Sequence, residues 1–174
     1  EEMLQKAAAA LGDNAIYHAG DVADEVSVAA ALEMTREKFG TVHINVNSAG
    51  IGGAARTVGR NGPMPLQKFE HIVRVNLIGT FNVLRLCAEV MQLNDPVTAD
   101  NERGVIINVA SIAAFDGQTG KAGYAALMGG IVWMVLAIAR DRAKRGIRVN
   151  TIAPGVFETA LLASALDEVR DPLI

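Results

Sequence analysis

The sequence predicts an α/β fold in which a parallel sheet is doubly wound by helices. Segments with helical spacing alternate with short apolar segments along most of the chain, without an internal repeat or a long linker. The segment at residues 104–110 is nearly all apolar, which is typical of a strand covered on both faces of a parallel sheet. This alternation indicates parallel strands joined by crossover helices.

Apolar spacing and end signals define the expected elements in order. Gly12 and Gly40 end the first two helices, a glycine-rich loop leads to Pro65, and an acidic loop at residues 94–103 precedes the third strand. The expected helices cover residues 2–11, 24–39, 66–93, 122–145 and 158–170. The expected strands cover residues 15–18, 42–46, 104–110 and 147–152.

Composition narrows the class of protein. A length of 174 residues suits one domain with a sizeable core, and a net charge of −3 does not favour nucleic acid or an anionic membrane as a partner. The apolar run Ala125–Ala139 contains two glycines and is short for a bilayer span. The single cysteine, Cys87, lies in an apolar stretch and suits a reducing compartment. Because the chain opens without the pattern of a secretory signal, we expect a cytoplasmic protein.

Two hydroxyl side chains, Ser111 and Tyr124, form the most informative pair. Ser111 follows the apolar strand, at the carboxyl edge where open α/β sheets bind their ligands. Its hydroxyl can donate to a carbonyl oxygen and stabilise negative charge that develops there. Tyr124 can give or take a proton, although a phenol with a pKa of about 10 is a weak base at neutral pH. The pair indicates proton transfer at a carbonyl group.

Three segments, Val75–Val83, Ile106–Phe115 and Ile147–Thr159, together resemble the short-chain dehydrogenase/reductase family. The loop Ile112–Gln118 resembles the branch that acts on 3-hydroxyacyl-CoA and hydroxysteroid substrates. The resemblance implies a single dinucleotide-binding domain of Rossmann type over residues 1–174. It also implies an NAD(P)-dependent oxidoreductase that interconverts a secondary alcohol and a ketone. The implied cofactor is NAD, and NADP stays open as the alternative. Because the branch includes mitochondrial proteins, the mitochondrial matrix is the alternative to a cytoplasmic location.

The sequence has no Gly-x-x-x-Gly-x-Gly turn before a helix, the feature that holds a pyrophosphate in this fold. The glycines at Gly50, Gly52 and Gly53 follow a later strand and do not match that turn. We therefore expect the domain to lack its first strand, with the glycine turn, and its last strand.

The resemblance also implies a set of cofactor-binding residues at the strand ends. They are Asp21, Val22, Asn47, Ser48, Ala49, Gly50, Pro154, Gly155, Phe157 and Thr159. Asp21 and Val22 are implied at the adenine ring, and the alternative is a helix N-cap for the segment that begins at Asp24. Asn47 is implied at the ribose and in bracing the sheet, with a plain turn role as the alternative. The segment after Pro154 is implied at the nicotinamide, with an ordinary strand-to-helix turn as the alternative.

Two further positions bear on catalysis. Asn76 is implied to bend its helix and to hold a water of a proton relay; the alternative is a buried asparagine bonded to a neighbouring carbonyl. The family also has a lysine one turn after the tyrosine, which lowers the tyrosine pKa and binds the nicotinamide ribose. Here Met128 occupies that position, and Lys121 is the only nearby candidate for a replacement cation.

Two functions follow from these residues. The first is a dehydrogenase in which Tyr124 is the acid or base and Ser111 orients the carbonyl of a small-molecule substrate. The second is a catalytically silent relative, with Met128 in place of the lysine, that binds ligands or forms oligomers. The helix at Gly129–Ala139, which includes Trp133, is apolar nearly all round, so we expect a homo-oligomer, and the resemblance implies a tetramer. We expect no metal.

Overall fold

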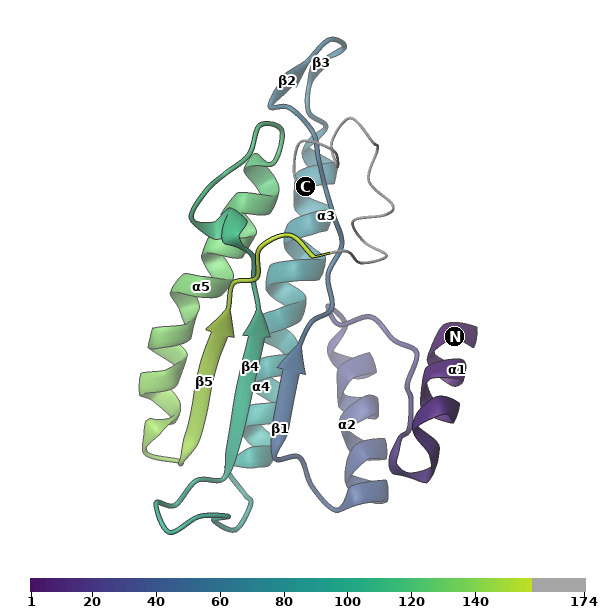
Figure 1. Cartoon of the computed structure of the whole chain (residues 1–174), viewed down its shortest axis with the longest axis vertical. Helices are drawn as coiled ribbons and strands as arrows, with labels where there is room; N and C mark the ends of the chain where they lie inside the picture. Colours follow the sequence, from purple (N-terminus) through teal and green to yellow (C-terminus); the bar gives the residue numbers. More distant parts are fainter. Residues whose placement is uncertain (158–174) are drawn as a thin grey trace.

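The computed structural model describes residues 1–157 and has a parallel three-stranded sheet at its centre. Its strands are β1 (Ile44–Asn47), β4 (Gly104–Val109) and β5 (Ile147–Ile152), in the order β1-β4-β5. The register pairs Asn47 with Asn108, and Asn108 with Thr151. Because the three strands run in one direction, their carboxyl ends share one edge of the sheet (Figure 1).

Helices flank this sheet in the described part of the chain. Helix α4 packs on β1 and β4, α5 packs on β5, and α2 packs on α4. In Figure 1, α1 lies outside α2, at the far side of the molecule from α5. The bounds are α1 (Glu2–Leu11), α2 (Glu25–Phe39), α3 (Leu66–Val73), α4 (Gly79–Met91) and α5 (Ala122–Ala143).

The larger part of the core lies between the sheet and these helices. Ile106 in β4 and Met91 in α4 are both fully buried, because β4 turns alternate side chains toward the helix layer. Within residues 1–157 the other face of the sheet is more open, with Ile44 66% and Val46 54% exposed. The buried residues of this core are Val42, Leu84, Cys87, Ala88, Met91, Ile106, Ile147 and Val149.

The long helix that the sequence predicted over residues 66–93 is three segments. A π-helical turn, η2 (Arg74–Ile78), joins α3 to α4 and contains the buried Asn76. The side-chain amide of Asn76 is hydrogen-bonded to the backbone of the loop after β1. These bonds help the helix to accommodate one extra residue in the π turn. Gly79 follows directly, and a Cβ atom at this position would lie 2.6 Å from a methyl carbon of Val22, so the close approach requires glycine.

The structure corrects two other expectations. Residues 15–18 do not form a strand; they follow the short 3-10 helix η1 (Gly12–Asn14), and among the described residues no strand pairs with them. The loop before Pro65 contains a small antiparallel hairpin, β2 (Val58–Gly59) and β3 (Gly62–Pro63), which was not predicted. The expected helix at 158–170 lies outside the described residues, as does Thr159.

Candidate active site

The loops after β4 and β5 are joined at the carboxyl edge of the sheet. Ser111 follows β4 and precedes the 3-10 helix η3 (Ile112–Ala114), and its Oγ accepts a hydrogen bond of 3.2 Å from the Ala113 N–H. The Ile112 N–H donates to the Pro154 carbonyl at 3.0 Å, which ties the loop after β5 to the same place. The serine is thus fixed at the edge where the sequence predicted it.

Tyr124 reaches this edge from the first turn of α5. The phenol is partly buried, and burial raises its pKa, while a side-chain hydrogen bond with Ser111 lowers it. The hydroxyl groups of Ser111 and Tyr124, which the sequence predicted as a pair, therefore lie close enough for Ser111 to affect the phenol. Because burial is the larger influence, the phenol stays protonated at neutral pH and can donate a proton.

Met128, one turn further along α5, has an apolar environment. It is 6% exposed and belongs to a second buried cluster, against which Tyr124 also packs. The buried members of this cluster are Ile72, Ala110, Leu127, Met128 and Ile131. The methionine brings neither a charge nor a hydrogen-bond donor to the tyrosine.

Lys121 lies immediately before α5, at the N-cap position of the helix. Its Nζ is 5.8 Å from the centroid of the Tyr124 ring, so the side chain lies over that ring. The sequence identified Lys121 as a candidate cation, and the structure places it within reach of the tyrosine.

Asn76 uses both amide atoms on one residue of the loop after β1. Its Oδ1 accepts from the Ile51 N–H at 2.8 Å and its Nδ2 donates to the Ile51 carbonyl at 2.9 Å. The Thr80 hydroxyl donates to the Asn76 carbonyl at 2.6 Å. These contacts are those of a buried asparagine bonded to neighbouring backbone, and they hold the loop that carries Gly50 close to the π turn.

Asn47, at the end of β1, is buried and donates from Nδ2 to the Oδ1 of Asn108 at 2.8 Å. This bond braces β1 against β4, in agreement with the structural role predicted for Asn47. The next three residues, Ser48, Ala49 and Gly50, are exposed at the carboxyl edge. They therefore lie on the surface of this edge.

Asn47 is the first of three polar side chains that lie in a row across the sheet, and this polar row was not predicted from the sequence. Asn108 and Thr151 continue this row across the sheet. Within the described structure, Asn108 Nδ2 and Thr151 Oγ1 are buried without a hydrogen-bond partner. An asparagine in the otherwise apolar segment 104–110 was the available signal.

The Asp21-Val22 pair lies in the turn before α2. Asp21 Oδ1 accepts from the Ala23 N–H at 2.8 Å, and its Oδ2 is 3.9 Å from Arg74 Nη2. The alternative that Asp21 caps α2 is wrong, because the cap is Asp24, whose carboxylate accepts two backbone hydrogen bonds of 3.3 Å. The Val22 side chain packs against Gly79.

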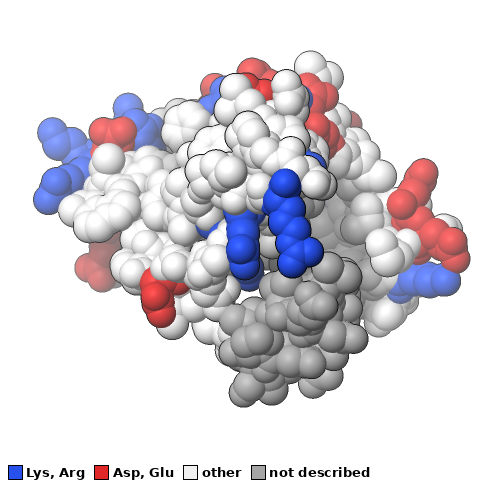
Figure 2. Space-filling view, turned by 90° about the horizontal axis from the view of Figure 1, so that it is seen from above, with Lys and Arg blue, Asp and Glu red and all other residues white. Residues whose placement is uncertain are grey.

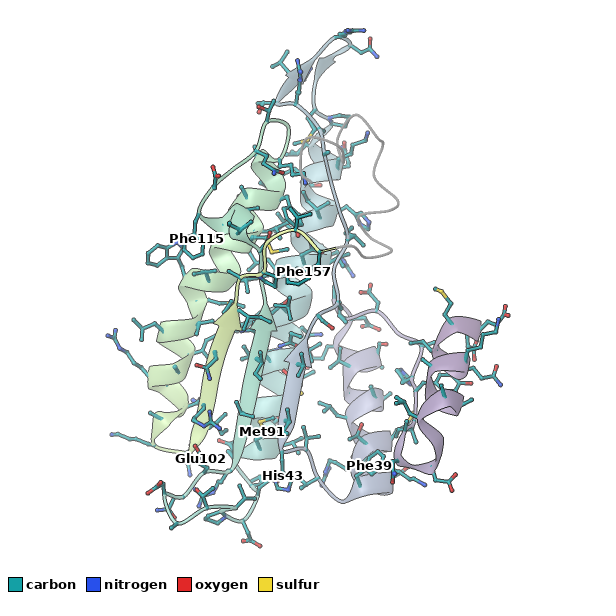
Figure 3. The ribbon with its side chains drawn as sticks, in the orientation of Figure 1. Phe39, His43, Met91, Glu102, Phe115 and Phe157 are labelled. Atoms are coloured by element: carbon teal, nitrogen blue, oxygen red, sulfur yellow. The ribbon has the colours of Figure 1, made fainter. Side chains whose placement is uncertain are left out.

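The loop after β5 carries the remaining predicted residues. Pro154 is partly buried, and a Cβ atom built at Gly155 would meet no atom of residues 1–157 within 4 Å. Phe157 is 67% exposed and lies at the far end of this loop, beyond the carboxyl edge of the sheet (Figure 3). Phe115, by contrast, points outward beside α5 in the same view.

Three further observations concern other kinds of site. Among the described side chains, no group of three His, Cys, Asp or Glu residues could hold a metal ion. Helix α5 is long and apolar enough to cross a membrane by length and composition, a test that core helices of water-soluble proteins also pass. Viewed from above, acidic and basic side chains are interspersed, mostly around the rim (Figure 2).

Known proteins resemble nearly the whole chain. The model of the short chain dehydrogenase family matches residues 1–170. The 3-hydroxyacyl-CoA dehydrogenase type-2 of Rattus norvegicus is 52% identical over 163 residues, which are 92% of this chain and 62% of the rat protein. The Homo sapiens protein of the same name is 49% identical over 161 residues, covering 91% of this chain and 61% of that protein.

A solved structure gives the same result for the fold. The crystal structure of 3-hydroxyacyl-CoA dehydrogenase type-2 from Mycobacterium avium matches with a TM-score of 0.87 and 38% sequence identity, over 97% of this chain and 66% of that one. The predicted fold class is confirmed. The chain spans about 62% of the length of the curated rat relative that it matches.

Proposed function

Since the chain belongs to the short-chain dehydrogenase family, we propose that the protein is an NAD(P)-dependent oxidoreductase that interconverts a secondary alcohol and a ketone. The observation that carries this proposal is the proximity of Ser111, after β4, to Tyr124, in the first turn of α5, at the carboxyl edge of the sheet. A phenol beside a hydroxyl donor suits a carbonyl group that must be oriented and protonated.

The residues at this edge fit the nicotinamide end of a dinucleotide. Ser48, Ala49 and Gly50 are exposed after β1, and a Cβ atom at Gly155, after β5, would meet no atom of the described residues within 4 Å. Asp21 and Val22 would lie at the adenine end. Because Met128 supplies no ammonium, the ribose lacks the contact that the family lysine would make. When bound, the cofactor supplies or accepts a hydride.

In the direction of ketone reduction, the Ser111 Oγ–H donates a hydrogen bond to the carbonyl oxygen and stabilises its growing negative charge. The Tyr124 Oη–H would give its proton to that oxygen as the carbonyl carbon gains a hydride, and the two together yield the alcohol. In the reverse direction the tyrosine must be a phenolate before it can take the proton, which burial disfavours.

The substrate class that we propose is a 3-hydroxyacyl-CoA or a hydroxysteroid-like alcohol, with NAD as the cofactor and NADP as the alternative. Relatives named 3-hydroxyacyl-CoA dehydrogenase type-2 support this choice. We also propose a homo-oligomer, a tetramer by family resemblance, through α5, on which Trp133 is 78% and Leu136 57% exposed. A cytoplasmic location is proposed first and the mitochondrial matrix second.

The test compares Tyr124→Phe with Tyr17→Phe, a matched control far from Ser111 along the chain. Ketone reduction is followed by NADH absorbance in the intact protein, with 3-ketoacyl-CoA and ketosteroid substrates. We expect Tyr124→Phe to lose at least about 10²-fold in rate, while NADH binding and the control are unchanged. Activity unaltered by Tyr124→Phe would contradict the mechanism.

One observation favours a second function. Because Met128 is buried in an apolar cluster, the protein could be a silent member of the family that binds ligands or forms oligomers. In that case the wild-type protein turns over none of the ketones, although it still binds NADH. The same assay therefore distinguishes the two functions.

A further inference from the structure

The side chains that lie before and after Tyr124 along the chain differ in charge and in burial. On the side of the following turn lies Met128, inside an apolar cluster. On the side of the preceding turn lies Lys121, with its Nζ 5.8 Å from the ring centroid. Residues three apart on a helix are neighbours, so this approach follows from the position of Lys121 at the helix start.

The backbone around Lys121 is fixed by three hydrogen bonds. The Lys121 N–H donates to the Gln118 carbonyl at 3.1 Å, and the Ala125 N–H donates to the Lys121 carbonyl at 2.8 Å. The Ala55 N–H donates to the carbonyl of the preceding residue, Gly120, at 2.7 Å. The Lys121 side chain therefore extends from a backbone segment whose position is fixed by hydrogen bonds.

We propose that Lys121 supplies the positive charge that stabilises the Tyr124 phenolate, the electrostatic task for which Met128 is unsuited. This inference rests on the proposed function, and it adds a residue that acts through the tyrosine. A cation over an aromatic ring is attracted to the ring face, and the attraction increases when the phenol loses its proton.

The other charged groups near Tyr124 are few in the described structure. From α3, the residues that adjoin the start of α5 are Phe69 and Ile72, which are not titratable, and the titratable Lys68, Glu70 and His71 are exposed. Helix η3 has no charged residue, and the neighbouring Asp116 is exposed. Within residues 1–157, Arg56 is the competitor to test, because its Cγ would lie 3.9 Å from a Cβ atom at Gly120.

The size of the effect follows from the distance. The 5.8 Å runs from Nζ to the ring centroid, whereas the phenolate charge lies mainly on Oη, so the distance sets only the order of the effect: a pKa shift of about 0.5 unit in a water-like medium and about 2 units at a protein surface. Removal of the charge in Lys121→Met is therefore expected to move the titration midpoint of Tyr124 upward by about one pH unit.

The experiment is a spectrophotometric titration of the phenol in the intact protein. Subtracting the titration of Tyr124→Phe isolates the Tyr124 step from that of Tyr17. We expect Lys121→Met to raise the midpoint, Lys121→Arg to restore it, and Lys68→Gln, an exposed lysine on α3, to leave it unchanged. In alcohol oxidation, which needs the phenolate, the rise of activity with pH should move by the same amount.

Three results would overturn the inference. The midpoint could stay the same in Lys121→Met, it could fall, or Arg56→Gln could produce the shift instead. Failure of the proposed function gives a different pattern, since no variant would then oxidise an alcohol. The titration shift would still be measured in that case, because it requires neither substrate nor cofactor.

Discussion

Replacing Met128 by lysine places a charge beside Tyr124 and also disturbs the packing beneath α5. The methionine is 6% exposed, so its burial contributes about 2–3 kcal/mol to the free energy of unfolding. The lysine stem recovers part of that contact, but its ammonium must leave water. We expect Met128→Lys to lower the free energy of unfolding by about 2–4 kcal/mol, measured by urea denaturation.

The same substitution should raise the rate of alcohol oxidation. A cation next to the phenol lowers its pKa, so the phenolate forms at lower pH. Acid–base assistance is worth roughly 10²–10⁴-fold, and we expect a gain at the lower end of that range, because Lys121 already supplies part of the charge. The assay is NADH formation from a 3-hydroxyacyl-CoA by the intact protein across a range of pH.

Met128→Gln is the matched control, since glutamine has a similar length without the charge. It should lose stability as the lysine variant does, without the gain in rate. A folded Met128→Lys protein that is no faster than Met128→Gln would refute the electrostatic reasoning. A gain that persists when Tyr124→Phe is added would refute the assignment of the acid or base.

Burial raises the pKa of Cys87 from 9.0 to about 12, so the thiol should resist alkylation in the native protein and react after unfolding. Because the raised pKa keeps the thiol neutral in the folded protein, the contribution of Cys87 to the free energy of unfolding is complete below pH 9 and is lost progressively between pH 9 and 12. Urea denaturation at several pH values would reveal this loss. Gly79→Ala places a methyl 2.6 Å from Val22 and should cost about 1–3 kcal/mol of unfolding free energy, whereas Gly129→Ala, with its nearest contact at 3.9 Å, should stabilise the helix by about 0.5–1 kcal/mol. Asn76→Ala removes two hydrogen bonds to the loop after β1 and should cost about 1–3 kcal/mol, with faster amide exchange in that loop; unchanged exchange would show that other contacts hold it.

Apolar periodicity predicted most of the helices and strands, because they bury one face or one stripe. The strand expected at residues 15–18 failed for another reason. A strand needs a hydrogen-bonding neighbour, and among the described residues none lies beside this segment. Local composition carries no information about such a neighbour.

The π turn could not be read from local sequence either. Its key contact joins Asn76 to Ile51, which lies 25 residues earlier in the chain. Periodicity continues through residues 66–93, so the sequence indicated one helix. The polar row through Asn108 depends in the same way on strand register, which sequence spacing alone does not fix.

The site residues were easier to place because most of them stand at strand ends. What sequence spacing left open was the reach of Lys121, since a long side chain can point to solvent or over the ring. The structure shows it over the ring of Tyr124.

The family resemblance gives one lysine two tasks, to stabilise the phenolate and to bind the nicotinamide ribose, and in this chain those tasks are separable. Lys121 approaches the ring of Tyr124, which serves the first task. The second requires a donor at position 128, where the chain has a buried methionine. Proton transfer should therefore be less impaired than cofactor affinity. This separation predicts a high KM for the cofactor together with a rise in activity with pH that still depends on Lys121.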